Sequence, residues 1–98
     1  MAIKNNRENK TGNILLTAEA SGEKAFFMMN GKVVTRLVDL PDNIENSDDQ
    51  TFSYHVNDQK NDFASWISNV FNAKQLARKI SMIKNKGEMV SVLKSQLR

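Results

Sequence analysis

Hydrophobic and polar positions along this chain follow two spacings, with short β-prone runs first and apolar residues three and four positions apart afterwards. The first pattern consists of AFFMM at 25–29 and KVVT at 32–35, separated by Asn30 and Gly31. An Asn-Gly pair between β-prone runs favours a two-residue type I′ turn, in which both residues take a positive φ. We therefore expect a β-hairpin whose strands meet at Asn30-Gly31.

Both faces of this hairpin are apolar. Because successive side chains of a strand point to opposite sides, Phe26 and Met28 lie on one face and Phe27 and Met29 on the other. A two-stranded hairpin is only marginally stable alone, so one face is expected to pack on helices. The other face needs a cover, which is either residues 13–20, whose alternation resembles that of a strand, or a second protein chain.

The helical pattern begins with a short segment and a capping motif. Apolar residues at 37, 40 and 44 predict one short helix, which Pro41 is expected to break. Ser47 and Gln50 match a capping box, which predicts a helix that starts at Ser47 and ends near Asn57. The buried stripe of this helix is expected to be Phe52, His55 and Val56.

The stretch HVNDQKNDFASWISNVF at 55–71 holds the single histidine and the single tryptophan of the chain, so it is a candidate for a site as well as for a helix. Asn61 is a favourable N-cap, Asp62 places a carboxylate in the first turn, and Asn72 is expected to end the helix. Trp66 lies in the middle of the apolar stripe, which favours a role in the core over ligand stacking. The stripe consists of Phe63, Trp66, Ile67, Val70 and Phe71.

Two further helices complete the pattern. The first is expected to stop at Asn85-Lys86-Gly87, and the second to run to the end of the sequence. Their apolar stripes are Leu76, Ala77, Ile80 and Ile83, and then Met89, Val90, Leu93 and Leu97. The sequence therefore predicts an α+β fold that is mainly α, with an N-terminal β-hairpin packed on a bundle of four to five short helices. Residues 1–22 are expected to be a largely flexible tail, and residues 23–98 a single globular domain.

Composition narrows the class of protein. The 98 residues are 40% hydrophobic and 26% charged, which is typical of a globular domain. The absence of cysteine excludes disulfides, thiolate zinc sites and thiol catalysis. The first residues carry positive charge without a following apolar segment, and the longest apolar run is far too short to span a bilayer. We expect a cytoplasmic protein that does not associate with membranes.

The charges are segregated along the chain. Residues 39–62 hold seven acidic residues and one basic residue, whereas residues 63–98 hold seven basic residues and one acidic residue. Three interpretations remain open: two solvated faces of one domain that attract each other, a head-to-tail self-association, or a basic surface for an anionic partner.

Candidate chemistry is sparse. His55, Asp58 and Asp62 could form a metal or acid-base cluster, but zinc sites usually take more histidines, and Asp62 already has a role at a helix start. The glycines are scattered singly, and no nucleophile-elbow motif is present. We expect no catalytic residue, no metal and no cofactor. His55 is expected to hydrogen-bond the 57–61 loop and hold two helices at a fixed angle.

The middle of the chain resembles a family of small archaeal and bacterial domains of unknown function. Those domains combine a hairpin with a Gly-Lys turn, a Phe-x-x-His-Val-Asn segment and the motif Asn-Asp-Phe-Ala-x-Trp-Ile-x-x-Val-Phe. The resemblance covers about residues 25–80 and departs from the family at Pro41 and at Asn72-Ala73. It supports the fold and implies no known activity. The matching residues include Gly31, Lys32, Phe52, His55, Val56, Asn57, Asn61, Asp62, Phe63, Ala64, Trp66, Ile67, Val70 and Phe71.

Two functional hypotheses from different classes follow. The first is a small non-catalytic protein-interaction module that binds another protein or its own copy through the hairpin or a C-terminal helix. The second is nucleic-acid binding through the basic C-terminal helices, although their basic helix lacks interleaved aromatic residues. The candidate interaction residues are Phe26, Met28, Lys74, Arg78 and Lys79.

Overall fold

The computed structural model describes residues 15–97, so most of the predicted tail lies outside the described residues. The chain forms a short antiparallel hairpin followed by helices, which confirms the predicted α+β class with a mainly helical fold. The elements in order are a 3₁₀ turn η1 (Gly22–Lys24), β1 (Phe26–Phe27), β2 (Val33–Val34), a 3₁₀ turn η2 (Leu37–Asp39), α2 (Leu40–Glu45), α3 (Asp49–His55), α4 (Asp62–Phe71), α5 (Lys74–Ser81) and α6 (Lys86–Gln96).

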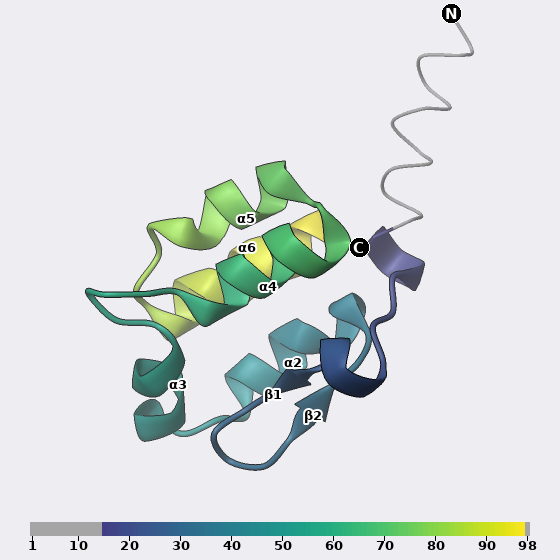
Figure 1. Cartoon of the computed structure of the whole chain (residues 1–98). Helices are drawn as coiled ribbons and strands as arrows, with labels where there is room; N and C mark the ends of the chain where they lie inside the picture. The colour runs from purple at the N-terminus through teal and green to yellow at the C-terminus, as the bar shows by residue number, and fades with distance from the viewer. Residues whose placement is uncertain (1–14, 98) are drawn as a thin grey trace, which may run out of the picture.

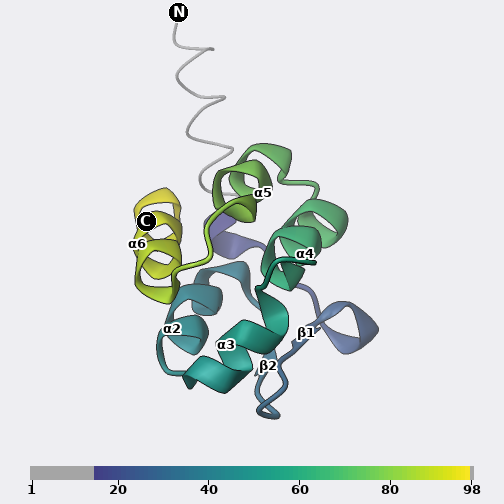
Figure 2. The ribbon, with the colours of Figure 1, turned by 90° about the vertical axis from the view of Figure 1, so that its left-hand side faces the viewer.

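The elements are arranged in two parts around one core. Helix α5 contacts both α4 and α6, and α2 contacts α6 from the other side. Figure 1 shows α4, α5 and α6 running side by side, with the hairpin and α2 together at the opposite side of the molecule. The view in Figure 2, turned by 90°, shows α6 and α4 on either side of α5. The hairpin thus packs on the helices through one face.

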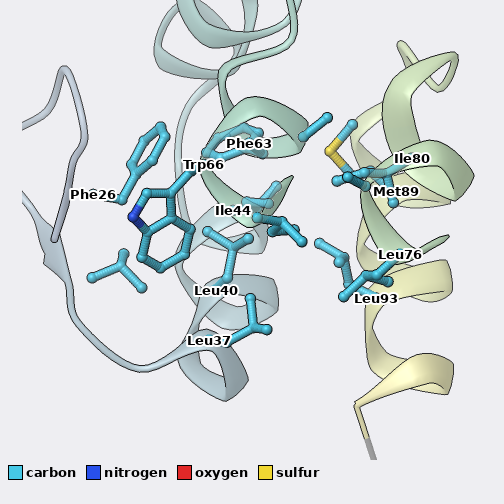
Figure 3. Close-up of a cluster of buried hydrophobic side chains, with 14 of the residues drawn as sticks. Phe26, Leu37, Leu40, Ile44, Phe63, Trp66, Leu76, Ile80, Met89 and Leu93 are labelled. Carbon is cyan, nitrogen blue, oxygen red and sulfur yellow. The ribbon is translucent and has the colours of Figure 1, made fainter. Parts of the chain in front are cut away.

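The core joins the hairpin to all the long helices. The ring of Phe26 lies 5.0 Å from that of Phe63 and 5.5 Å from that of Trp66, measured between centroids. Figure 3 shows Phe26 and Trp66 side by side at one end of the cluster, while Met89 and Leu93 meet Ile80 and Leu76 at the other end. The predicted stripes of α3, α4, α5 and α6 supply most of these buried side chains.

The hairpin is confirmed, but its turn is not of type I′. Strand pairing places Phe26 opposite Val34 and Phe27 opposite Val33. Gly31 has a φ of 93°, whereas Asn30 has no positive φ. The Gly31 N–H donates to the Met28 carbonyl, and the Met28 N–H donates to the Lys32 carbonyl. This geometry is a three-residue loop with one glycine in the left-handed region, the next most common hairpin type.

The described part of the predicted tail packs on the domain. Residues 15–17 are helical, and Ala20 is buried. The Ala20 N–H donates to the Thr35 carbonyl, and the Leu37 N–H donates to the Ala18 carbonyl. Residues 15–22 therefore belong to the packed unit, and one isolated bridge, Glu19 with Arg36, takes the place of the third strand considered from the sequence.

The helix boundaries predicted from the sequence are confirmed at some ends and are wrong at others. Asn61 caps α4, since its side-chain oxygen accepts from the Ala64 N–H, and Asn72 ends α4 with a φ of 56°. The cap of α3 is Asp48 and not Ser47, because Ser47 is buried and its hydroxyl donates to the Ile44 carbonyl. Asn85 was expected to stop a helix and instead caps α6, accepting from the Glu88 N–H.

The predicted broken helix at 37–44 consists of two joined turns. The 3₁₀ turn η2 leads directly into α2, and Pro41 lies in the first turn of α2. Proline is tolerated at this position because the first N–H groups of a helix have no partner within it. The proline therefore marks where the 3₁₀ turn gives way to the α-helix.

Candidate interaction surfaces

The hairpin separates its apolar residues into a buried face and an exposed face. Phe26 and Met28 are buried in the core, so these two candidate interaction residues are not available to a partner. The other face carries Phe27, Met29 and Val33, which are 60%, 44% and 51% exposed. We call these three residues the outer hairpin face. Both faces are apolar in sequence, so the alternation alone does not indicate which one the helices cover.

The cross-strand register explains this outer face. Phe27 lies directly opposite Val33, so the two side chains form one pair on the same side of the sheet. Met29 is the first residue of the three-residue loop that follows, and its side chain is also exposed. The next inward pair, Phe26 and Val34, is buried beneath them. Sequence reasoning could have identified this face only by pairing Phe27 with Val33. That pairing follows from the length of the turn, which the sequence did not determine.

His55 fixes the turn end of the outer hairpin face. It is 3% exposed, and its Nε2 accepts the N–H of Met29 at 3.0 Å. Because Nε2 accepts, the ring proton lies on Nδ1, which donates to Asp62 Oδ2 at 3.0 Å. His55 therefore ties the hairpin to the start of α4, and not to the 57–61 loop. Its two ring nitrogens both have structural partners.

The acidic residues near His55 do not form one cluster. Asp62 contacts His55 and Lys60, whereas Asp58 pairs with Lys84 at 2.7 Å. Across the described residues, no three histidine, cysteine, aspartate or glutamate side chains are arranged so that they could hold a metal ion. Burial of Asp62 by itself raises its pKa, but the hydrogen bonds from His55 and Lys60 and the positive charge of Lys60 outweigh burial and hold the pKa below its ordinary value.

The second surface is the basic side of α5. Lys74, Arg78 and Lys79 are exposed on this helix, as a basic interaction surface requires. A groove of about 390 Å³ lies between α4 and α5, with Lys74 and Arg78 in its lining. The Nζ of Lys74 donates to the hydroxyl of Ser68 on α4 at 2.7 Å. Three of the five candidate interaction residues are thus accessible, and they lie together on one element.

Comparison of the chain with protein-family models, with curated proteins and with solved structures found no match. Within residues 15–97, no helix is long and apolar enough to cross a lipid bilayer. The outer hairpin face and the basic side of α5 are therefore the surfaces from which we infer a function.

Proposed function

We propose that this chain is a small non-catalytic protein-interaction module that docks through the outer hairpin face. The observation that carries the proposal is the exposure of three large apolar side chains on one hairpin, the cross-strand pair Phe27 and Val33 and the adjoining loop residue Met29. Single exposed apolar residues are ordinary on protein surfaces, but a contiguous group on a rigid element is typical of an interface.

Covering this face releases a useful amount of free energy. A fully buried aromatic side chain removes about 150–250 Å² from water, so covering the exposed part of Phe27 contributes about 2 to 4 kcal/mol before the cost of association. Met29 and Val33 add smaller amounts of the same kind. These free energies of burial are sufficient for a weak interface. Such an interface becomes specific only if polar residues surround the apolar contact.

The face is also fixed in shape before any partner arrives. His55 holds the Met29 N–H, and the indole N–H of Trp66 donates to the Lys24 carbonyl at 2.8 Å, so both ends of β1 are anchored to helices. An anchored face loses little conformational entropy on binding. The commitment of both nitrogens of His55 to this scaffold supports a structural rather than a catalytic role for the histidine.

The partner that we propose is a second copy of the chain. A two-fold symmetric contact brings the same residues of both copies together, which is unfavourable for charged groups and favourable for apolar ones. Phe27, Met29 and Val33 are uncharged, so this face can meet itself without like-charge repulsion at its centre.

Sedimentation velocity of the double variant Phe27→Ser/Val33→Thr tests the proposal. The wild-type chain should form a dimer as its concentration rises, and the variant should weaken that dimer by about 10-fold or more, since loss of about 1.4 kcal/mol suffices. Met82→Ser is the matched control, because Met82 is 83% exposed but lies at the end of α5. A wild-type chain that stays monomeric, or a dimer weakened equally by Met82→Ser, would contradict self-docking through the hairpin.

A further inference from the structure

The fold sorts the basic residues of the C-terminal half into two groups. Lys84 pairs with Asp58, Lys86 lies 3.7 Å from Asp49, and Lys94 pairs with Glu45 at 3.1 Å. Each of these lysines thus meets an acidic residue of the middle segment. These pairs between the two oppositely charged segments hold Lys84 and helix α6 against the rest of the domain.

The second group, on α5, keeps its charge. No acidic side chain among the described residues lies within ion-pairing distance of Lys74, Arg78 or Lys79, and the sequence has no acidic residue between Asp62 and Glu88. Neither α4 beyond its first residue nor α5 supplies a carboxylate that would neutralise the three cations. Three exposed cations without an acidic partner among the described residues therefore lie together on α5.

Two hollows flank these cations. The first is the groove of about 390 Å³ between α4 and α5, whose polar lining residues include Ser65, Ser68 and Asn69 together with Lys74 and Arg78. The second, of about 370 Å³, is lined by Gln75, Arg78 and Lys79. Arg78 lines both hollows. Hydroxyl and amide groups together with cations are the donors that bind phosphate oxygens in protein–nucleic acid contacts.

We propose that α5 binds the phosphate backbone of a nucleic acid, with successive phosphates seated in the two hollows on either side of Arg78. Adjoining hollows that share one arginine fit a ligand with repeated phosphates better than a single small anion. The side chains that line the hollows include no aromatic residue, so base stacking has no platform there. Binding is accordingly independent of base sequence and governed by salt.

Fluorescence anisotropy with a short labelled duplex DNA of mixed sequence tests this proposal. With about three phosphate contacts, the logarithm of affinity falls with the logarithm of salt concentration with a slope near −2.7, which is about a 40-fold loss between about 50 and about 200 mM salt. The double variant Arg78→Gln/Lys79→Gln should reduce that slope by about 2 and remove most of the affinity at low salt.

The matched control is Lys84→Gln/Lys94→Gln, which removes the same amount of charge from lysines that already have acidic partners. This control should retain affinity within about 3-fold of the wild type at low salt, because its lysines are already neutralised. Thermal unfolding of both variants by circular dichroism confirms that each is folded. Equal losses in the two variants would overturn the assignment to α5, because net charge alone would then explain the binding.

Two further measurements test this inference. The first keeps it separate from docking through the hairpin, and the second asks whether phosphate groups are required. Phe27→Ser/Val33→Thr should leave DNA affinity per subunit unchanged, so failure of one proposal does not decide the other. A poly-glutamate competitor should displace the DNA only weakly, since carboxylates lack the repeated phosphate oxygens. Displacement by poly-glutamate as effective as by unlabelled DNA, or the absence of any salt-dependent binding, would contradict the proposal.

Discussion

At the scale of single residues, two buried side chains with polar atoms connect the hairpin to the helices. Trp66 fills the core between Phe26 and Phe71 and donates its indole N–H to the Lys24 carbonyl. His55 accepts the Met29 N–H and donates to Asp62. No buried side-chain nitrogen or oxygen among the described residues lacks a partner. Each of these side chains therefore both packs and satisfies a polar group.

Trp66→Ala should lower the free energy of unfolding by about 3 to 5 kcal/mol, because it empties an aromatic site that is only 7% exposed. Trp66→Phe is the matched variant, since it keeps one aromatic ring while it loses the N–H donor to Lys24 and part of the indole volume, and it should cost about 1 to 2 kcal/mol. Urea unfolding measures both. A loss below about 1 kcal/mol for the alanine variant would contradict the core role of Trp66.

Asp62 gives the domain a defined response to acid. The pKa of Asp62 is lower in the folded chain than its ordinary value, so the folded state binds fewer protons than the unfolded state as the pH falls. The stabilisation from Asp62 is complete above the ordinary aspartate pKa of about 3.9 and is lost as the pH falls through the lowered folded value.

Asp62→Asn should therefore flatten the decline of stability below about pH 4, while reducing stability near neutral pH where the charged pairing with Lys60 is lost. Urea unfolding measured over a series of acidic pH values follows both effects. A variant whose stability declines with acid as steeply as that of the wild type would show that Asp62 does not carry this response.

At the scale of elements, apolar spacing predicted which segments are helical, while local capping chemistry left their ends ambiguous. The stripes of α4 and α6 could be predicted because their apolar residues recur with helical period. The N-cap of α3 was predicted one residue early, at Ser47 instead of Asp48, because both residues are good caps and only packing decides that Ser47 is buried. Asn85 likewise suits a helix end and a helix start.

In the hairpin, too, the local sequence predicted the element without determining its exact geometry. The Asn-Gly pair predicted the turn, but a three-residue loop and a two-residue loop both use glycine at this point, so the pair does not determine the loop length. Loop length sets which residues pair across the strands, and the covering helices set which face is buried. For this reason Phe26 and Met28 were predicted as candidate interaction residues, whereas the exposed apolar side chains of the hairpin are Phe27, Met29 and Val33.

Gly31→Ala should destabilise the chain by about 1 to 2 kcal/mol, because its φ of 93° is strained for any residue with a Cβ atom. The added methyl group meets no atom within 4 Å, so the effect is conformational. Gly87→Ala is the matched control with the opposite sign, since Gly87 lies within α6 and alanine there should add up to about 1 kcal/mol. Equal effects of the two substitutions in urea unfolding would contradict this description of the turn.

At the scale of the whole molecule, charge and apolar surface are distributed to different elements. The acidic middle segment pairs with Lys84 and with the lysines of α6, the cations of α5 have no acidic partner among the described residues, and the hairpin carries exposed apolar side chains. The segregation of charge was visible in the sequence. The identity of the lysines that form ion pairs was not, because residues far apart in the chain, such as Glu45 and Lys94, come together only in the fold.

Residues 15–22 contribute to the stability of this arrangement. Deletion of residues 1–22 removes the bonds from Ala20 to Thr35 and from Leu37 to Ala18, and should cost about 2 kcal/mol more than deletion of residues 1–14. Comparison of the two deletions in urea isolates the described segment. Equal stabilities would show that residues 15–22 add nothing to the packed unit.

The most direct test of docking through the outer hairpin face is a dilution series followed by amide chemical shifts in NMR spectra. Shifts that depend on protein concentration should be concentrated at residues 27–33 and at neighbouring Tyr54, whose ring lies against His55. Amides of α5 and α6 should keep constant shifts. Concentration-dependent shifts centred on α5 or α6, or shifts that stay constant throughout the chain, would contradict the account.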